Sequence, residues 1–243
     1  MKNTIKLILQ KLLGYERYLF VFSKFKIRTL KKDKKEGDFF LFIDEVKSNG
    51  DILDVGANIG IMTYHLAKHF PTKKVYSIEP MPNNLAVLNK IIKYYKLNNV
   101  EVKPLALGEK KEELEMVLPL DGKVKMQGLA HVVHDSIDEW NEGEKIKVQC
   151  ETLDNLFSDT PISGIKMDIE NFEYFALKGG EQLLKKNHPV VYLELWENAN
   201  RTQCFDLLTS LGYSPFVNEN NNLVAFDPLK HKKQNFIFKV SSN

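Results

Sequence analysis

The sequence predicts an α/β fold with a doubly wound, mostly parallel sheet, an inserted β excursion and a C-terminal hairpin. From residue 39 onward, short apolar strands alternate with segments of helical periodicity. A glycine-containing turn joins the first strand to its helix, and acidic residues stand at the ends of four strands. Because strands separated by helices are expected to run parallel, their carboxyl ends should lie at one edge of the sheet.

Length and composition indicate a globular protein with one main domain. The 243 residues are 43% hydrophobic and 27% charged, which is ordinary for such proteins. We expect an amphipathic and basic N-terminal extension over residues 1–38 and a single domain over residues 39–243. The formal net charge of +2 provides no overall attraction to a polyanion, so no nucleic-acid partner is expected.

The cysteines and the N-terminus favour a cytoplasmic location. Cys150 and Cys204 lie far apart and form no CxxC pair, so we interpret both as reduced and buried. The sequence shows no secretory signal and no apolar run of the roughly 20 residues that a spanning helix needs.

The first 35 residues differ in character from the rest of the chain. Apolar residues recur at helical spacing over 5–13, and an aromatic-rich stretch over 15–25 leads into a basic run. Such a segment could lie peripherally on a membrane, contact another subunit, cover one end of its own domain or form a wall of the substrate site. The sequence leaves these four interpretations open.

The alternation of strands and helices is regular in the first half of the main domain. Pro82 suits the first turn of a helix, which helps to place one boundary. The expected elements are, in order, helix 39–47, strand 51–55, helix 61–70, strand 74–78, helix 82–96 and strand 100–107.

A long excursion then interrupts this pattern. Strands are expected over 114–118 and 146–153, and the stretch between them is rich in Gly, His and Asp. Long irregular segments inside compact domains are commonly functional, so residues 119–145 are a candidate substrate lid.

The parallel pattern resumes after the excursion. The expected elements are strand 164–169, helix 171–186, strand 190–195 and helix 199–211, which Gly212 ends. A hairpin over 215–227 closes the core, and the short apolar run 236–238 is expected to form an edge strand.

The turn after the first strand is the most informative feature of the chain. Residues 51–60 read Asp-Ile-Leu-Asp-Val-Gly-Ala-Asn-Ile-Gly, and the next strand ends in Glu79-Pro80. A turn with little side chain lets a ligand approach the N–H groups at the start of a helix, and the acidic group is placed to bind ribose hydroxyls. The candidate cofactor-binding residues are Asp54, Gly56, Ala57, Asn58, Gly60, Glu79 and Pro80.

The ligand expected at this turn is an adenosine compound without phosphates. Asn58 stands where a diphosphate-binding turn would have a second close glycine, and no Gly-Lys-Ser/Thr triplet follows. S-adenosylmethionine is the common cofactor of this kind. The alternative, a tight turn that binds nothing, is weakened by Glu79.

Acidic residues at the ends of the later strands are the candidate catalytic groups. Methyl transfer to a hydroxyl needs an in-line acceptor and a base that takes its proton. We hypothesise that Asp168 is this base or orients the acceptor, with Glu170 and Glu194 completing the pocket. Lys166 alternates with the acids of its strand and is interpreted as their structural partner.

Two histidines in the excursion, His131 and His134, precede Asp135 and could share one helical face. Without a further local signature they are interpreted as surface residues, with a contact from His131 to the acceptor left open. No metal site is predicted.

The motifs taken together resemble the FkbM family of S-adenosylmethionine-dependent methyltransferases. The resemblance implies a Rossmann-like fold, O-methylation of a hydroxyl that is often on a sugar or natural product, and cofactor contacts from Asp54, Gly56, Asn58 and Glu79. It also implies that Ala106 lies near the adenine. It covers about residues 50–215 and is carried by 54–60, 79–80, 106–108, 152–154, 165–170, 173, 177–179, 194 and 211–213.

One position departs from the family pattern. The family usually has Gly after the glutamate of the Asp-x-Glu segment, whereas this chain has Asn171. Asn tolerates the left-handed backbone region and caps helices well, so the turn should be preserved.

The expected function is transfer of a methyl group from S-adenosylmethionine to a hydroxyl of a saccharide or related metabolite. The expected partner is therefore a small-molecule or glycan acceptor. Two alternatives stay open: a non-catalytic adenosyl-ligand-binding or scaffold protein of the same fold, and an NAD-dependent dehydrogenase, which Asn58 in the turn disfavours. Asp168 and Glu194 favour catalysis.

Overall fold

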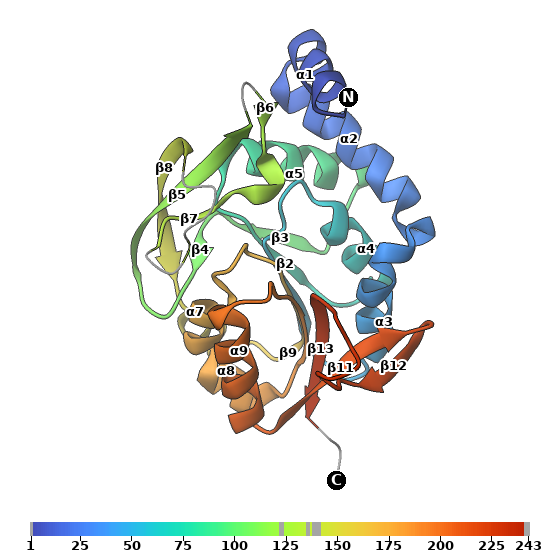
Figure 1. The fold of residues 1–243 in the computed structure, drawn as a ribbon, viewed down its shortest axis with the longest axis vertical. Helices are drawn as coiled ribbons and strands as arrows, with labels where there is room; N and C mark the ends of the chain where they lie inside the picture. Colours follow the sequence, from blue (N-terminus) through green and yellow to red (C-terminus); the bar gives the residue numbers. More distant parts are fainter. Residues whose placement is uncertain (1, 122–123, 135–136, 138–141, 241–243) are drawn as a thin grey trace.

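The computed structural model describes residues 2–121, 124–134, 137 and 142–240. An eight-stranded sheet forms its centre (Figure 1). The five strands from β3 to β10 are parallel, and β13, β11 and β12 continue the sheet in antiparallel pairs, which confirms the predicted doubly wound fold. The strand order is β12 (Asn222–Ala225), β11 (Tyr213–Glu219), β13 (Asn235–Val240), β10 (Val190–Glu194), β9 (Ile162–Met167), β1 (Asp51–Val55), β2 (Val75–Ile78) and β3 (Val100–Lys103).

Helices cover both faces of this sheet because successive strand residues point to opposite sides. Ile52 of β1 packs in one core cluster with α3 (Gly37–Glu45) and α4 (Ile61–His69). Leu53, its neighbour, packs in the other cluster with α7 (Glu173–Lys178), α8 (Glu181–Asn187) and α9 (Ala199–Ser210), and the short helix α6 (Leu153–Leu156) lies beside α8. Burying each such Leu or Ile side chain contributes roughly 1.5–3 kcal/mol.

The inserted excursion forms a second sheet beside the first. Its path runs β4 (Ala106–Leu107), β8 (Gly143–Glu151), β5 (Glu112–Asp121) and β6 (Val124–Lys125), and β7 (His131–Val132) pairs with β5. Part of the stretch expected to be irregular is therefore strand, with a short 3-10 helix η3 (Gln127–Leu129). The rest of the candidate lid, residues 122–123, 135–136 and 138–141, lies outside the described residues.

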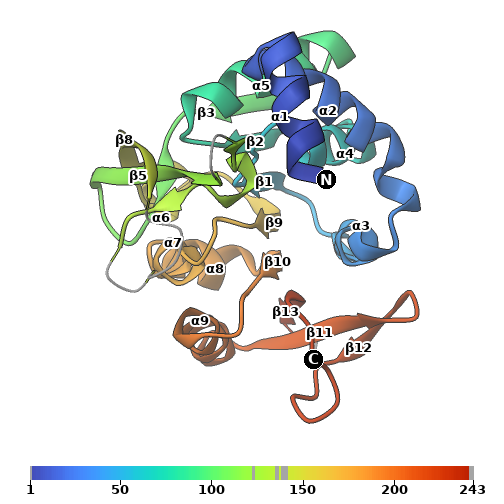
Figure 2. The ribbon, with the colours of Figure 1, turned by 45° about the horizontal axis from the view of Figure 1, so that its top comes forward.

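The N-terminal segment forms two helices, α1 (Lys2–Leu13) and α2 (Tyr15–Thr29), on the outside of α4 and α5 (Pro82–Tyr95) (Figures 1 and 2). Leu19 and Ile27 of α2 are buried in one cluster with Val87 and Ile91 of α5. The packing matches the interpretation that this segment covers part of its own domain. Nowhere in the described part of the chain is a helix both long and apolar enough to span a bilayer.

Three expected elements were wrong in extent or position. The strand expected over 100–107 breaks after Lys103, because Pro104 lacks an N–H, and continues as β4 in the second sheet. The helix expected over 171–186 is two short helices, which Gly179 and Gly180 separate. A Cβ at position 179 would lie 2.1 Å from the carbonyl oxygen of Gly108. The C-terminal strand β13 lies inside the sheet, between β10 and β11, and not at its edge.

Candidate active site

The turn between β1 and α4 contains three residues with left-handed backbone. Their φ values are 72° at Gly56, 50° at Asn58 and 80° at Gly60. A Cβ at position 56 would lie 1.9 Å from the carbonyl oxygen of Asp168. Glycine is required there by the backbone that follows β9, a reason that the sequence did not reveal. The turn is therefore fixed against the segment that carries Asp168.

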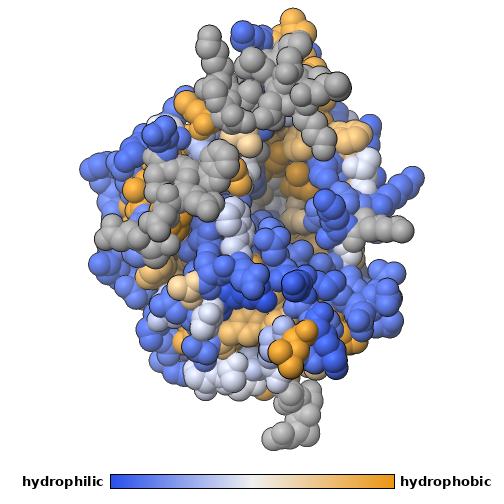
Figure 3. All heavy atoms as spheres, in the orientation of Figure 1, coloured by the Kyte–Doolittle hydropathy of each residue, from blue (hydrophilic) through white to orange (hydrophobic). Residues whose placement is uncertain are grey.

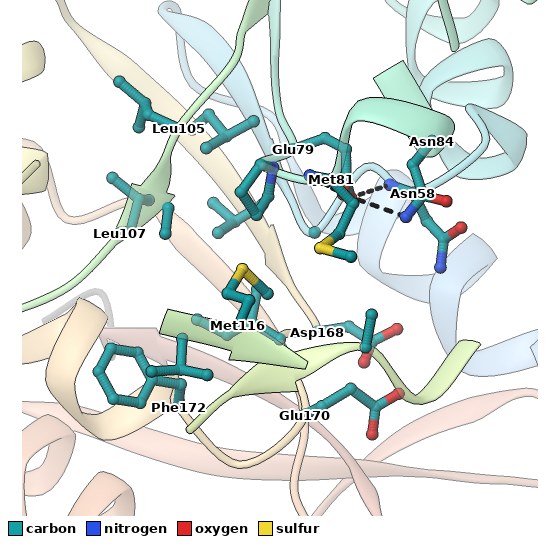
Figure 4. Close-up of a pocket in the computed structure, with 18 of the residues that line it drawn as sticks. Asn58, Glu79, Met81, Asn84, Leu105, Leu107, Met116, Asp168, Glu170 and Phe172 are labelled. Carbon is teal, nitrogen blue, oxygen red and sulfur yellow. Dashed lines mark hydrogen bonds between the residues drawn. The ribbon is translucent and has the colours of Figure 1, made fainter. Parts of the chain in front are cut away.

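Glu79 is buried at the end of β2 with its carboxylate held in one orientation (Figure 4). The N–H of Asn58 donates to Oε2 at 2.8 Å, while the N–H of Met81 and the side-chain amide of Asn84 donate to Oε1 at 2.8 and 3.1 Å. Burial raises the pKa of Glu79, although these hydrogen bonds and Lys166 oppose the rise. Because Oε2 accepts one described protein donor, it keeps a lone pair for a ligand hydroxyl.

A cavity that opens to solvent lies between this turn and the insertion, and the empty volume of about 630 Å3 around it includes part of that solvent. Figure 4 shows apolar side chains on one side, including Leu105, Leu107 and Phe172, and polar ones on the other, including Asn58 and Glu170. Figure 3 shows the same face of the molecule hollowed at its centre above a hydrophilic rim.

Lys166 lies between the buried Asp54 of β1 and Asp168, which follows β9. Its ammonium donates to the carbonyl of Gly56 at 2.9 Å and lies 3.6 Å from Asp54 Oδ1 and 3.8 Å from Asp168 Oδ2. Burial alone would lower the pKa of Lys166, but the facing carboxylates outweigh it and raise that pKa. The structural role expected for Lys166 fits this geometry, with Asp54 as an additional partner.

Carboxyl groups crowd together where β9 and β10 end. Burial, together with the charges of Asp168 and Glu194, raises the pKa of Glu170 to about 9. Burial and the charge of Asp168 also raise the pKa of Glu194 to about 7. The side chain of Asp168 is 36% exposed and reaches solvent. At neutral pH Glu170 is therefore protonated and can donate a hydrogen bond, while the side chain of Asp168 is open to solvent.

The turn after Asp168 is preserved by asparagine. Glu170 and Asn171 have φ values of 54° and 71°, so the left-handed conformation expected at Asn171 is present. The expected helix cap is absent, since α7 begins at Glu173, and the Asn171 side chain instead accepts a hydrogen bond from Asn198 at 2.7 Å. Glu173 buries its carboxylate behind the turn, where it accepts from the Ile169 N–H at 2.9 Å.

The structure brings together seven of the eleven candidate residues. The other four do not line the cavity. Asp54 is fully buried beneath it and accepts a hydrogen bond from Thr63 at 2.6 Å, and Glu194 ends the adjacent strand. Ala57 and Gly60 lie within the turn, away from the cavity wall. The candidates that do line the cavity are Gly56, Asn58, Glu79, Pro80, Ala106, Asp168 and Glu170.

Sequence reasoning missed the apolar half of the cavity. Asn84 could have been found from the sequence, because it lies in the first turn of the helix that follows Glu79-Pro80. The apolar residues gave no comparable signal, since they come from the bend after β3, from the insertion and from the turn before α7. Those missed lining residues are Met81, Leu105, Leu107, Met116, Val132 and Phe172.

The two histidines of the insertion differ in their environments. His131 is buried, with its Nδ1 2.8 Å from the carbonyl oxygen of Leu129, and His134 packs against Phe172 and Phe175. The expectation that they are surface residues was wrong for His131. Within the described residues, no group of three His, Cys, Asp or Glu side chains is arranged to hold a metal ion.

Known proteins with a similar sequence or fold are methyltransferases. Residues 54–225 match the family described as the methyltransferase FkbM domain. A curated protein named Methyltransferase 1, from Beauveria bassiana, is 20% identical over 142 residues, which cover 53% of this chain and 57% of that protein. The crystal structure of a methyltransferase FkbM from Methylobacillus flagellatus shares the fold, with a TM-score of 0.52 and 18% identity over 79% of this chain and 43% of that one. The chain thus spans about half of the length of these relatives.

Proposed function

The chain belongs to the FkbM methyltransferase family, and on this premise we propose that it transfers a methyl group from S-adenosylmethionine to a hydroxyl of a saccharide or related metabolite. The family match covers both the turn after β1 and the carboxylates that follow β9 and β10. The observation that carries the proposal is the solvent-reaching carboxylate of Asp168 on the wall of a cavity that also contains the buried carboxylate of Glu79.

The residues of the cavity suit S-adenosylmethionine. Glu79 offers an oriented carboxylate for ribose hydroxyls, and the apolar side that includes Leu105 and Leu107 suits the adenine ring. Asn58 Oδ1 is buried and lacks a hydrogen-bond partner among the described residues, so a ligand amino group would satisfy it. The cofactor supplies an activated methyl group whose transfer needs the acceptor oxygen in line with the S–CH3 bond.

The protein's own residues supply the base and orient the acceptor. Asp168 accepts the proton of the acceptor hydroxyl, and Lys166, 3.8 Å away, holds this carboxylate in place. Glu170, protonated at neutral pH because its pKa is about 9, donates a hydrogen bond that orients the acceptor. A hydrogen-bond acceptor, Asp168, and a donor, Glu170, lie close together, which suits a substrate with several hydroxyl groups.

Two measurements on the full chain test this proposal. Isothermal titration should show binding of S-adenosylmethionine and not of NAD, and radiolabelled methyl transfer to an extracted saccharide pool should identify the acceptor. Asp168→Asn should lower turnover about 100-fold or more and leave cofactor affinity within about twofold. Glu197→Gln, at an exposed carboxylate just after β10, is the matched control and should retain activity.

Three outcomes would contradict the proposal. Full turnover by the Asp168→Asn protein would remove Asp168 from the role of base. Tight cofactor binding without transfer to any hydroxyl would favour a non-catalytic adenosyl-binding protein. Binding of NAD in place of S-adenosylmethionine would overturn the cofactor assignment.

A further inference from the structure

The outward face of α2 carries an apolar strip beside a row of cations. Val21, Phe22 and Phe25 are 50%, 38% and 60% exposed, although each is a large apolar side chain. Val21 and Phe25 are four residues apart and therefore lie on one side of the helix, opposite the buried Leu19 and Ser23. Exposed apolar side chains at this spacing are costly in water unless another surface covers them.

Arg17, Lys24 and Arg28 flank this strip at positions i, i+7 and i+11 of the same helix. Among the described residues, none of the three forms an ion pair with a carboxylate, whereas exposed lysines of the insertion such as Lys145 and Lys147 are paired with Glu115 and Glu113. We define the α2 patch as Arg17, Val21, Phe22, Lys24, Phe25 and Arg28.

A groove beside the patch extends its positive charge. The groove lies between α2, α3 and α4, and Arg28, Lys31 and Lys68 contribute to its wall, together with the rings of Phe40 and Tyr64. No described carboxylate pairs with these three cations. An anionic group that approaches the α2 patch therefore meets further positive charge on the same side, which no described carboxylate neutralises.

Charge is distributed unevenly along the chain. Residues 1–35 contain eleven basic and two acidic residues, whereas residues 36–243 contain 23 basic and 30 acidic residues. An anionic surface would attract the N-terminal helices and repel the rest of the molecule. This asymmetry would orient the protein with α2 against that surface.

From these observations we propose that the α2 patch docks on the surface of an anionic lipid bilayer. The apolar strip enters the boundary between headgroups and acyl chains, and the flanking cations contact lipid phosphates. Apolar residues bordered by arginine and lysine are the pattern by which amphipathic helices lie in the plane of a bilayer. None of the residues of the α2 patch lines the cavity of the candidate active site.

The test is flotation of the full chain with phosphatidylcholine vesicles, with and without 30 mol% phosphatidylglycerol. Binding should require the anionic lipid and should weaken as NaCl rises from 50 to 500 mM. Arg17→Gln/Lys24→Gln/Arg28→Gln should weaken binding about 100-fold, and Val21→Ser/Phe25→Ser should weaken it about tenfold.

Matched controls separate the patch from general effects of substitution. Leu229→Ser alters a 94% exposed leucine in a distant loop, and Lys186→Gln/Lys230→Gln/Lys232→Gln removes three exposed charges elsewhere. Both control proteins should bind as the unaltered chain does. Circular dichroism melting should show that every variant is folded.

Several results would overturn the proposal. Equal binding to neutral and anionic vesicles, or unchanged binding of both patch variants, would exclude docking through this patch. A dimer in sedimentation that Val21→Ser/Phe25→Ser dissociates, without vesicle binding, would assign the patch to a second copy of the chain. Binding of RNA but not of vesicles, lost in the charge variant, would assign it to a nucleic acid.

Discussion

Replacing Glu170 by glutamine should stabilise the protein, and more so as the pH rises. The pKa of Glu170 is raised to about 9 by burial and by the neighbouring charges of Asp168 and Glu194, whereas its ordinary value is 4.5. The folded protein thus keeps a proton that the unfolded chain releases between these two values. The free energy of unfolding must therefore fall as pH rises from about 4.5 to about 9.

The size of this effect follows from the shift itself. Within this pH range, each pH unit lowers the free energy of unfolding by about 1.4 kcal/mol for a single group. Between pH 5 and pH 8 the unaltered chain should lose up to about 4 kcal/mol relative to Glu170→Gln, because glutamine ionises in neither state and resembles the protonated acid in shape. At pH 5 the two proteins should differ by about 1 kcal/mol or less.

Urea unfolding followed by circular dichroism at pH 5, 6, 7 and 8 measures this difference. Glu197→Gln serves as control, because Glu197 is exposed near the same strand end and its replacement should change the free energy of unfolding little. A stability difference for Glu170→Gln that stays constant from pH 5 to pH 8 would refute the reasoning. So would a difference that shrinks as pH rises.

Three further substitutions test the geometry of the site. Gly56→Ala should destabilise the protein by about 2 kcal/mol or more, measured by thermal unfolding, because its Cβ would meet the Asp168 carbonyl oxygen and φ is 72°. Glu79→Gln should weaken S-adenosylmethionine binding by about 1.5–3 kcal/mol in titration calorimetry, because an amide replaces a carboxylate that accepts charge-assisted hydrogen bonds. Asn171→Val should cost about 1–3 kcal/mol in urea unfolding, since a β-branched residue strains a φ of 71°.

Each of these substitutions has its own control. Gly128→Ala meets no atom within 4 Å and should be nearly neutral, so equal losses at positions 56 and 128 would contradict the steric argument. Unchanged affinity in the Glu79→Gln protein would show that the ribose is held elsewhere. For position 171, Asn171→Gly should retain the stability that Asn171→Val loses, and equal stability of the two would show that the turn is not strained.

The parts of the fold that could be predicted depend on local patterns. Strand 51–55 and the start of the helix at Pro82 were predicted correctly, because apolar runs, glycine and proline mark them directly. The place of β13 inside the sheet could not be predicted, since strand order arises from contacts between residues distant in sequence. The break at Gly179-Gly180 was visible as two glycines, but the close approach of Gly108 was not.

The candidate site likewise has a half that could be predicted from the sequence and a half that could not. Its polar half was predictable, because Glu79 and Asp168 end strands whose carboxyl ends must meet at one edge. Its apolar half was not, because Leu105 and Phe172 enter the cavity from bends and carry no motif. The fully buried position of Asp54, paired with Lys166 beneath the turn, also required the three-dimensional structure.

The contact between Gly56 and the backbone of Asp168 bears on how such an enzyme could be re-engineered. Because the turn after β1 and the segment after β9 touch at this point, neither strand end can be moved without disturbing the other. Variants for new acceptors should therefore be sought in the insertion around β7, which lines the cavity, and in the segment before α3, whose Glu36 acts on Glu194, because neither takes part in this contact. Variants with substitutions in those two segments should fold far more often than variants with substitutions at residues 56 and 168.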